Sequence, residues 1–277
     1  MTQYDIAYQN ALKDIMENGI EELNQRTGHK TKAIPGLTIK IDGASFPLLT
    51  LRKIPIKLFV AEQIWFLTGS KNPDELLGNY TKIWHDFRET DGTVAAAYGH
   101  RWRKHFGRDQ LGDLVRLLEK EPSSRHGVVV TWDPADDGLG TGTKKANIPC
   151  PYTFTMNIIG NKLHLHNVIR SNDMILGAPH DMAGFALLQH LIAAHLGVGV
   201  GQICYTVSNA HVYDIHYETA NEIINRKNDH KDIKLDLNKE DFSRAEKGES
   251  EVIDNIISKL ESQYFPLEAI KGLKIVL

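Results

Sequence analysis

Apolar and polar positions along the chain predict a mixture of helices and strands. Apolar side chains recur at helical spacing over residues 4–22, which predicts an amphipathic helix. Nearly continuous apolar runs predict buried helices over residues 56–69 and 183–196. A further helix, over residues 112–122, is expected to end at Pro122.

The expected strands are shorter and alternate with turn residues. They cover residues 36–43, 127–132, 152–169 and 202–215. The third of these reads as a hairpin that turns at Gly160 and Asn161, and residues 127–132 read as a buried strand. The charged segment 226–251 is expected to be a surface excursion around a short strand at 232–237. Helices and strands mix without strict alternation, which favours an α+β fold with a large mixed β-sheet packed by helices, in a single domain over residues 1–277.

Composition narrows the class of protein. The chain has 277 residues, 42% of them hydrophobic and 24% charged, as in an ordinary soluble globular protein. The net charge of −3 gives no reason to expect long nucleic acid as a partner. The N-terminus lacks an apolar signal region, no apolar window is long enough for a membrane span, and Cys150 and Cys204 are the two cysteines. We therefore expect a cytoplasmic protein with no membrane partner.

One polar pair stands directly before an apolar run. His180 and Asp181 precede residues 182–191, which are almost wholly apolar. Asp181 could cap the helix that starts there, because its carboxylate would accept from the free amides of the first turn. The alternative is that Asp181 faces a ligand.

Cys150, in the stretch NIPCPYTF, allows two similar interpretations. It could be a buried structural residue, or a nucleophile if cations nearby favour its thiolate. Arg26, Arg125 and Arg170 each lie where an apolar stretch meets a turn, so each is either a solvated surface charge or a contact to an anion.

Several motifs share one order and spacing over nearly the whole chain. They are RTG at 26–28, EQIWFLTGSKN at 62–72, IWHDF at 83–87, AAAYGHRWR at 95–103, SSRHGVVVTWDP at 123–134, IPC at 148–150, RSND at 170–173, LGAP at 176–179 and NAHVY at 209–213. In this order the motifs resemble those of the thymidylate synthase family. The resemblance implies that family's fold, a sheet-to-sheet homodimer, and one-carbon transfer from 5,10-methylenetetrahydrofolate to a pyrimidine nucleoside monophosphate.

The resemblance also implies roles for the nucleotide site. Cys150 would attack C6 of the base, and Arg125 would arrive from the other subunit to hold the 5′-phosphate. The remaining nucleotide contacts implied are Arg26, Arg170 and Ser171 to the phosphate, His211 and Tyr213 to the sugar 3′-hydroxyl, and Asp173 and Asp181 toward the base. Guanidinium groups suit a dianionic phosphate, and their field is expected to lower the pKa of the Cys150 thiol.

The folate and the proton-transfer network involve a second group of residues. The resemblance places Glu62, Tyr98 and Asp181 beside Cys150 among the catalytic residues. The expected folate contacts are Glu62, Ile83, Trp84, Asp173, Leu176, Gly177 and His180. No pair of His164, His166, His190 and His195 matches a usual zinc spacing, so we expect no metal.

Some positions depart from the thymidylate synthase pattern. The family has Asn, Phe, His, Gln, Arg and Leu where this chain has Asp181, His180, Pro151, Ile169, His126 and Asn147. Asp181 resembles the residue found in the deoxycytidylate and cytidylate hydroxymethylases of this family. A carboxyl group suits cytosine, because it accepts from the N4 amino group and shares a proton with N3, whereas an ionised carboxylate opposes O4 of uracil.

The departures therefore predict a deoxycytidylate (dCMP) 5-hydroxymethyltransferase. Three alternatives remain open: a CMP hydroxymethylase, a C5 methylase acting on dCMP or dUMP, and a non-catalytic regulator that binds nucleotide or RNA. The retained Cys150, Arg170, Asp173 and Tyr98 argue against the regulator, since a binding protein does not need the nucleophile.

Overall fold

A mixed β-sheet forms the centre of the computed structural model, which describes residues 1–138 and 148–276. The strands are β1 (Ile20–Asn24), β2 (His29–Ile41), β3 (Val128–Val130), β4 (Pro151–Ile159), β5 (Lys162–Ile169), β6 (Asn172–Asp173) and β7 (Gly199–Tyr213). They run in the order β1-β2-β7-β5-β4-β3, and β6 pairs with β7. The contacts of β7 with β5 and β6 are parallel, whereas β7 is antiparallel to β2, so the sheet is mixed as expected.

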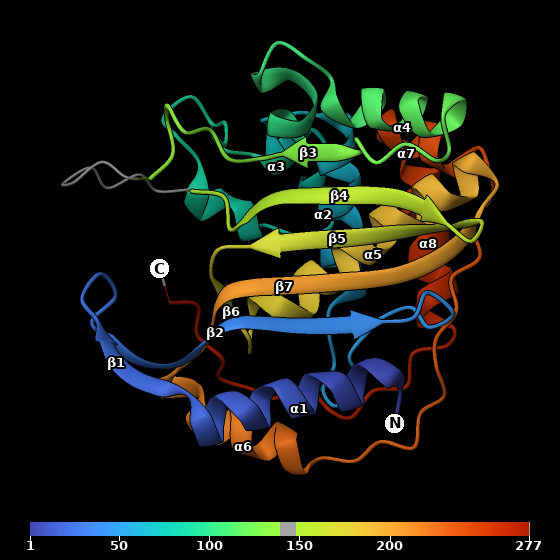
Figure 1. The fold of residues 1–277 in the computed structure, drawn as a ribbon. Helices are drawn as coiled ribbons and strands as arrows, with labels where there is room; N and C mark the ends of the chain where they lie inside the picture. Colours follow the sequence, from blue (N-terminus) through green and yellow to red (C-terminus); the bar gives the residue numbers. More distant parts are fainter. Residues whose placement is uncertain (139–147, 277) are drawn as a thin grey trace.

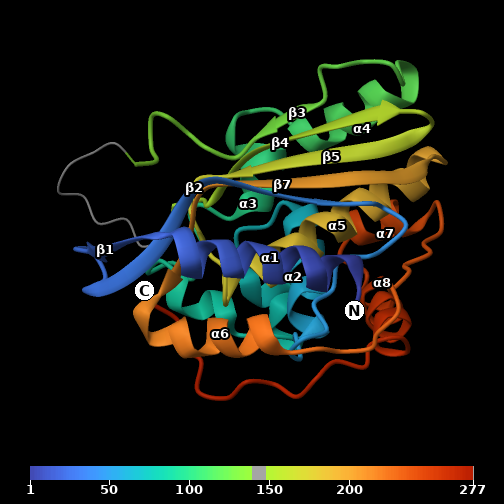
Figure 2. The same ribbon diagram turned by 60° about the horizontal axis from the view of Figure 1, so that its bottom comes forward.

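The helices gather on one face of this sheet (Figure 1). They are α1 (Gln3–Asn18), α2 (Ile56–Thr68), α3 (Tyr98–His100), α4 (Gln110–Lys120), α5 (Gly177–Leu196), α6 (Tyr217–Asn225), α7 (Asp241–Glu246) and α8 (Ser250–Glu261). The long apolar helix α5 packs against β5 and β7, and α2 packs on α5 and α8. Figure 2 shows α1 and α6 side by side at the β2 end of the sheet.

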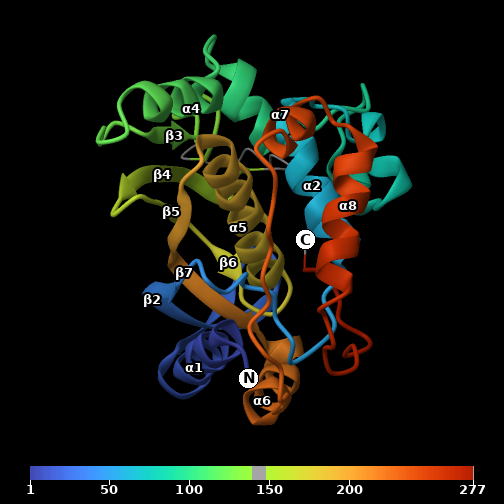
Figure 3. The same cartoon turned by 90° about the vertical axis from the view of Figure 1, so that its right-hand side faces the viewer.

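The other face of the sheet carries no described helix (Figure 3). Side chains of β5 alternate accordingly: Leu163, Leu165 and Asn167 are buried toward the helices, while His164 and His166 lie on the opposite face. Both histidines reach only neighbouring groups on that face, such as the Thr206 hydroxyl, 3.0 Å from Nε2 of His166. The outward face is thus polar and partly accessible.

The hairpin of β4 and β5 is confirmed. Gly160 and Asn161 both have positive φ, at 59° each, as a two-residue type I′ turn requires. Residues Ile159 and Lys162 pair directly on either side of them. Helix α2 is likewise confirmed, and it ends at Gly69 in the left-handed conformation with φ of 65°.

Several predicted boundaries were wrong. The first helix ends at Asn18, because Ile20–Asn24 leave it to pair with β2. The segment predicted as a buried strand at 127–132 is a three-residue edge strand, in which Val128 is 49% and Val130 is 38% exposed. Residues 232–237 form no strand, since Ile233 makes one isolated bridge to Phe46. The charged segment around them also includes α7, which the sequence did not predict.

The most consequential difference concerns α5. It begins at Gly177, six residues before the predicted start, with Leu176 at the N-cap position. Asp181 therefore lies inside the helix, past its first turn, and does not cap it. The helix-cap interpretation of Asp181 is wrong.

Close backbone contact fixes α3, which carries Tyr98, against the end of α2. A Cβ atom on Gly99 would lie 1.8 Å from the carbonyl oxygen of Phe66. We predict that Gly99→Ala lowers the free energy of unfolding by roughly 1–3 kcal/mol, because backbone must shift to admit the methyl group. Urea denaturation measures this. Gly78→Ala is the matched control, since a Cβ there meets nothing within 4 Å, and equal stability losses in both variants would contradict the prediction.

Candidate active site

A polar pocket of about 400 Å³ opens where β1, β2, β7 and the β5–β6 connection meet. Its lining contains five of the predicted nucleotide contacts. They are Arg26, Arg170, Ser171, His211 and Tyr213. Two guanidinium groups and a hydroxyl at one end, with an imidazole and a phenol beside them, form a surface suited to a phosphorylated sugar.

The sugar side of this pocket is ordered by hydrogen bonds. Nδ1 of His211 lies 3.0 Å from Oδ1 of Asn209 and 3.3 Å from its carbonyl oxygen, so Nδ1 carries the proton and Nε2 is left as an acceptor. Burial lowers the pKa of His211, which favours this neutral form. The Tyr213 hydroxyl accepts a hydrogen bond from Arg26. The pair can therefore donate to and accept from a sugar hydroxyl.

Cys150 lies just before β4, next to Arg170. Nη2 of Arg170 is 3.7 Å from the Cys150 sulfur, and Arg170 also donates to the carbonyl oxygens of Ile148 and Pro149 at 3.0 and 2.8 Å. One guanidinium thus fixes the backbone that carries the thiol and places positive charge beside it.

The expectation of a lowered thiol pKa is wrong for the protein without ligand. Burial raises the pKa of Cys150 above its usual value, and this outweighs the opposing effect of Arg170 and Arg26. The carboxylate of Asp181 raises it further. The thiol is thus protonated in this state. A nearby base must take its proton before the sulfur can attack.

Asp181 projects from α5 toward two polar groups of the sheet. Its Oδ2 accepts from Nδ2 of Asn172 at 2.5 Å and from the Tyr205 hydroxyl at 3.4 Å. Burial raises the pKa of Asp181 to about 6, and these two hydrogen bonds oppose the rise. The carboxyl group can consequently change protonation near neutral pH.

A second buried carboxyl group lies in the same region. Oε1 of Glu62, from α2, accepts from Nε1 of Trp84 at 2.6 Å. Burial raises the pKa of Glu62 to about 8, with a further contribution from the charge of Asp181. Tyr98 interacts electrostatically with Cys150, Asp181 and Glu62, so the four groups predicted to be catalytic form one cluster.

The residues predicted to meet the folate lie around this cluster. Ile83 and Trp84 belong to a 3₁₀ helix, Ile83–Phe87, and Trp84 stacks in tilted geometry on Phe87 at 5.5 Å. Leu176 and Gly177 start α5, and Asp173 accepts from the backbone amides of Ile175 and Leu176 at 2.8 and 3.2 Å, which holds this start in place.

His180 extends the group toward Arg52. Its Nδ1 is buried without a hydrogen-bond partner among the described residues. Burial, aided by Arg52, lowers the pKa of His180 to about 4. His180 is therefore neutral and offers an unused polar atom.

One predicted residue does not lie at this site in its own chain. Arg125 is exposed at the turn before β3, outside the pocket of its own chain. Asn147 lies outside the described residues. Conversely, the sequence did not single out Asn172, Tyr205 or Asn209, which hold Asp181 and His211. Asn172 lies within the RSND motif, but roles were predicted only for the other three residues of that motif.

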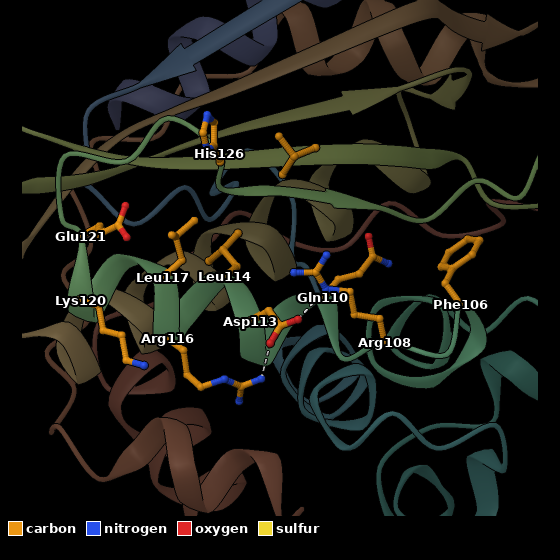
Figure 4. A pocket seen from close by; sticks show the side chains of 11 residues that line it. Phe106, Arg108, Gln110, Asp113, Leu114, Arg116, Leu117, Lys120, Glu121 and His126 are labelled. Carbon is orange, nitrogen blue, oxygen red and sulfur yellow. Dashed lines mark hydrogen bonds and ion pairs between the residues drawn. The ribbon is translucent and has the colours of Figure 1, made fainter.

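A second hollow, of about 520 Å³, lies between α4 and the exposed edge of β3 (Figure 4). Arg108 and Arg116 point into it, and both form ion pairs with Asp113 at 2.5 Å. None of the predicted site residues lines it. The pocket around Arg26 and Arg170, although smaller, is where the candidate chemistry gathers.

Metal sites and membrane-spanning helices are both absent from the described residues. Over 1–138 and 148–276, no group of three or more His, Cys, Asp or Glu side chains is arranged to hold a metal ion. No helix in the described part of the chain is both long and apolar enough to cross a membrane.

The polar pocket and the adjacent Cys150 are the parts expected of an enzyme that binds a nucleotide beside a cysteine nucleophile. The sequence model of the thymidylate synthase family matches residues 6–266, and the chain belongs to that family. It is similar to the thymidylate synthases of three Francisella tularensis subsp. holarctica strains, FTNF002-00 / FTA, OSU18 and LVS. Each is 34% identical to it over 230 residues, which cover 79% of this chain and 84% of the relative.

Membership establishes the general reaction. The chain is a one-carbon transferase that acts at C5 of a pyrimidine nucleotide, with methylenetetrahydrofolate as the cosubstrate. The neutral, partly accessible Glu62 beside Trp84 and the unpaired nitrogen of His180 fit the polar, aromatic ring system of a folate.

The raised pKa of Glu62 has a consequence for stability. A carboxyl group with its pKa raised to about 8 favours the folded state at low pH, and this contribution is lost as pH rises from the unfolded-state pKa through 8. Between pH 6.5 and 8.5 we predict a loss of roughly 2 kcal/mol in the wild type that Glu62→Gln does not show. Urea denaturation at both pH values measures it. The exposed Glu218→Gln should keep the wild-type loss, and a Glu62→Gln variant that loses as much would contradict the assignment.

Proposed function

We propose that the chain is a deoxycytidylate 5-hydroxymethyltransferase. The reaction converts dCMP, 5,10-methylenetetrahydrofolate and water to 5-hydroxymethyl-dCMP and tetrahydrofolate. The observation that carries the proposal is the carboxyl group of Asp181, which interacts electrostatically with Cys150 and, among the described residues, accepts hydrogen bonds on Oδ2 alone.

Asp181 distinguishes the two pyrimidines by their hydrogen-bonding edges. Cytosine offers an N4 amino donor and an N3 acceptor, and a carboxyl group with a pKa of about 6 can accept from the first and share a proton with the second. Uracil offers O4, an acceptor, against which an ionised carboxylate is repelled. A buried mismatch of this kind costs roughly 2–5 kcal/mol, or about 30- to 5000-fold in selectivity.

In the proposed mechanism, Arg170 and Arg26 hold the phosphate while the Cys150 thiolate adds to C6. Electron density then moves toward N3, where the proton shared with Asp181 stabilises it. C5 bonds to the methylene carbon of the cosubstrate and loses its proton, with Tyr98 and Glu62 near enough to take part in proton transfer. Tetrahydrofolate leaves, water adds to the exocyclic methylene, and Cys150 departs from C6.

Water rather than hydride is proposed as the final nucleophile because of two polar positions. His180 stands where thymidylate synthases have Phe, and its unpaired Nδ1 makes the folate side more polar. Asn147 stands where they have Leu, although it lies outside the described residues. Hydroxymethylation leaves tetrahydrofolate unoxidised, whereas methylation would produce dihydrofolate.

The alternative functions differ from the proposed one in the sugar of the substrate, in the product, or in whether the chain catalyses a reaction at all. His211 and Tyr213 address the 3′-hydroxyl, so ribo-CMP remains a candidate substrate. A C5 methylase acting on dCMP or dUMP is the next. A non-catalytic nucleotide or RNA binder is disfavoured by the juxtaposition of Arg170 and the Cys150 sulfur.

Incubation with methylenetetrahydrofolate and, separately, dCMP, CMP and dUMP tests the proposal. Mass spectrometry of the products should show hydroxymethyl addition to dCMP, and absorbance near 340 nm, where dihydrofolate would be seen, should not rise. Methylated product with a stoichiometric rise of dihydrofolate would replace hydroxymethylation by methylation.

Asp181→Asn is predicted to shift preference from dCMP toward dUMP. A carboxamide donates to O4 and accepts from N3–H of uracil, so the ratio of kcat/KM for dCMP to that for dUMP should fall by about 30-fold or more. Steady-state kinetics with both nucleotides measures the ratio. Asp241→Asn, the same change at another buried carboxylate, should leave it unaltered. An unchanged ratio in Asp181→Asn would remove the basis for a cytosine substrate.

We also propose a homodimer formed through the sheet face that carries no described helix. In it, Arg125 of each chain would contact the nucleotide bound by its partner. Its exposure, and the absence of any hydrogen-bond partner for it among the described residues, support this role.

Arg125→Ala is accordingly predicted to weaken nucleotide binding by roughly 1.5–3 kcal/mol, the scale of a charged hydrogen bond. Mixing this variant with an inactive Cys150→Ala variant should restore part of the activity, because hybrid dimers contain one intact site. Activity assays after subunit exchange measure this. Exchange without recovery would contradict a shared site.

A further inference from the structure

Among the described residues, hydrogen bonds reach only one oxygen of the Asp181 carboxylate. Nδ2 of Asn172 donates to Oδ2 of Asp181 at 2.5 Å and to the Tyr205 hydroxyl at 2.9 Å, and that hydroxyl donates to the same Oδ2 at 3.4 Å. The three side chains close a triangle. No described residue donates to Oδ1.

The triangle joins three separate elements. Asn172 belongs to β6, Tyr205 to β7 and Asp181 to α5, and the first two side chains are 3% and 1% exposed. Asp181 itself is partly accessible. Oδ2 is therefore directed into the protein, and Oδ1 is the oxygen left for a ligand.

We propose that Tyr205 and Asn172 are positioning residues that hold Asp181 by Oδ2 and keep it ionised, so that Oδ1 can discriminate between cytosine and uracil. This inference rests on the proposed function, which it deepens by naming what maintains the selectivity.

The protonation state matters because a protonated carboxyl group is no longer selective. Its O–H, on Oδ1, can donate to O4 of uracil, so that the repulsion of O4 is lost. Only the ionised group presents acceptors alone and repels O4. Two donors to Oδ2 stabilise that charged form.

The surroundings of Asp181 oppose ionisation. Burial raises its pKa, while Asn172 and Tyr205 act in the other direction. The other titratable groups that interact with Asp181 are Tyr4 from α1, Glu62 from α2, Tyr98 from α3 and Cys150 at the start of β4. All four are neutral or negative in their usual forms, so none supplies a compensating positive charge. Removing either donor should shift Asp181 toward its protonated form.

Tyr205→Phe tests this with little change of shape. The ratio of kcat/KM for dCMP to that for dUMP should fall roughly three- to tenfold, the worth of one hydrogen bond. The pH dependence of this ratio should shift to higher pH. Part of the selectivity that the variant loses at pH 7 should therefore return at higher pH. Asn172→Ala should act in the same direction. Tyr264→Phe is the matched control, because its buried hydroxyl donates to the carbonyl of Leu49 instead.

A second measurement does not depend on the substrate. Infrared difference spectra of the protein without nucleotide, assigned by comparison with Asp181→Asn, follow the protonation of this carboxyl group. The apparent pKa should be higher in Tyr205→Phe than in the wild type and unchanged in Tyr264→Phe. An unaltered titration in both Tyr205→Phe and Asn172→Ala would overturn the inference. A wild type that prefers dUMP would instead refute the proposed function, while the infrared titration would still decide whether Tyr205 and Asn172 keep Asp181 ionised.

Discussion

The rest of the site depends on two buried carboxyl groups that interact electrostatically, those of Glu62 and Asp181. Burial raises the pKa of Glu62 to about 8 and that of Asp181 to about 6, and the charge of Asp181 adds to the cost of ionising Glu62. Two negative charges this close in a poorly solvated region are unfavourable, so at neutral pH Glu62 retains its proton while Asp181 can lose its own. One region thus holds a proton donor and an ionised acceptor. A difference between the pKa values of two carboxyl groups suits a reaction in which the enzyme must both recognise a base and transfer protons.

The fold makes this arrangement possible by bringing strand ends and helix starts together. β6 extends the sheet by two residues beside β7 and then turns through Asp173 into α5. That turn places Asn172 and Asp181 within hydrogen-bond distance, although they are nine positions apart. Arg170, just before β6, reaches Cys150 at the start of β4. The residues proposed to hold the phosphate, supply the thiol and face the base are therefore carried by neighbouring segments of one sheet, and a shift in any of these segments would affect the others.

Much of this could be predicted from the sequence, where local chemistry decided the outcome. The apolar run of α2, the Gly160–Asn161 turn and the alternation on β5 each follow from short-range rules, and the structure confirms them. Ordered motifs were sufficient to identify the family. The start of α5 was missed because Gly177, Pro179 and His180 do not look like the first turn of an apolar helix. The carboxylate of Asp173, which accepts from the backbone amides of Ile175 and Leu176, holds the start of the helix there.

The groups that hold the candidate catalytic residues were the least predictable part. Nothing local marks Tyr205, which reads as one more buried residue of a strand, and its contact with Asp181 depends on the packing of α5 against β7. The net effect of burial and charge on the pKa of the Cys150 thiol was equally hard to predict. Nearby arginines are visible in a sequence, but the depth of burial that outweighs them is not.

Calorimetric titration of dCMP and dUMP into the protein at pH 7.5, without folate, tests the central claim most directly. Binding alone reports on the base edge, free of any assumption about the carbon transfer that follows. The account predicts that dCMP binds at least about 30-fold more tightly than dUMP, the lower end of the cost of a buried acceptor–acceptor mismatch. Equal affinities, or tighter binding of dUMP, would contradict it.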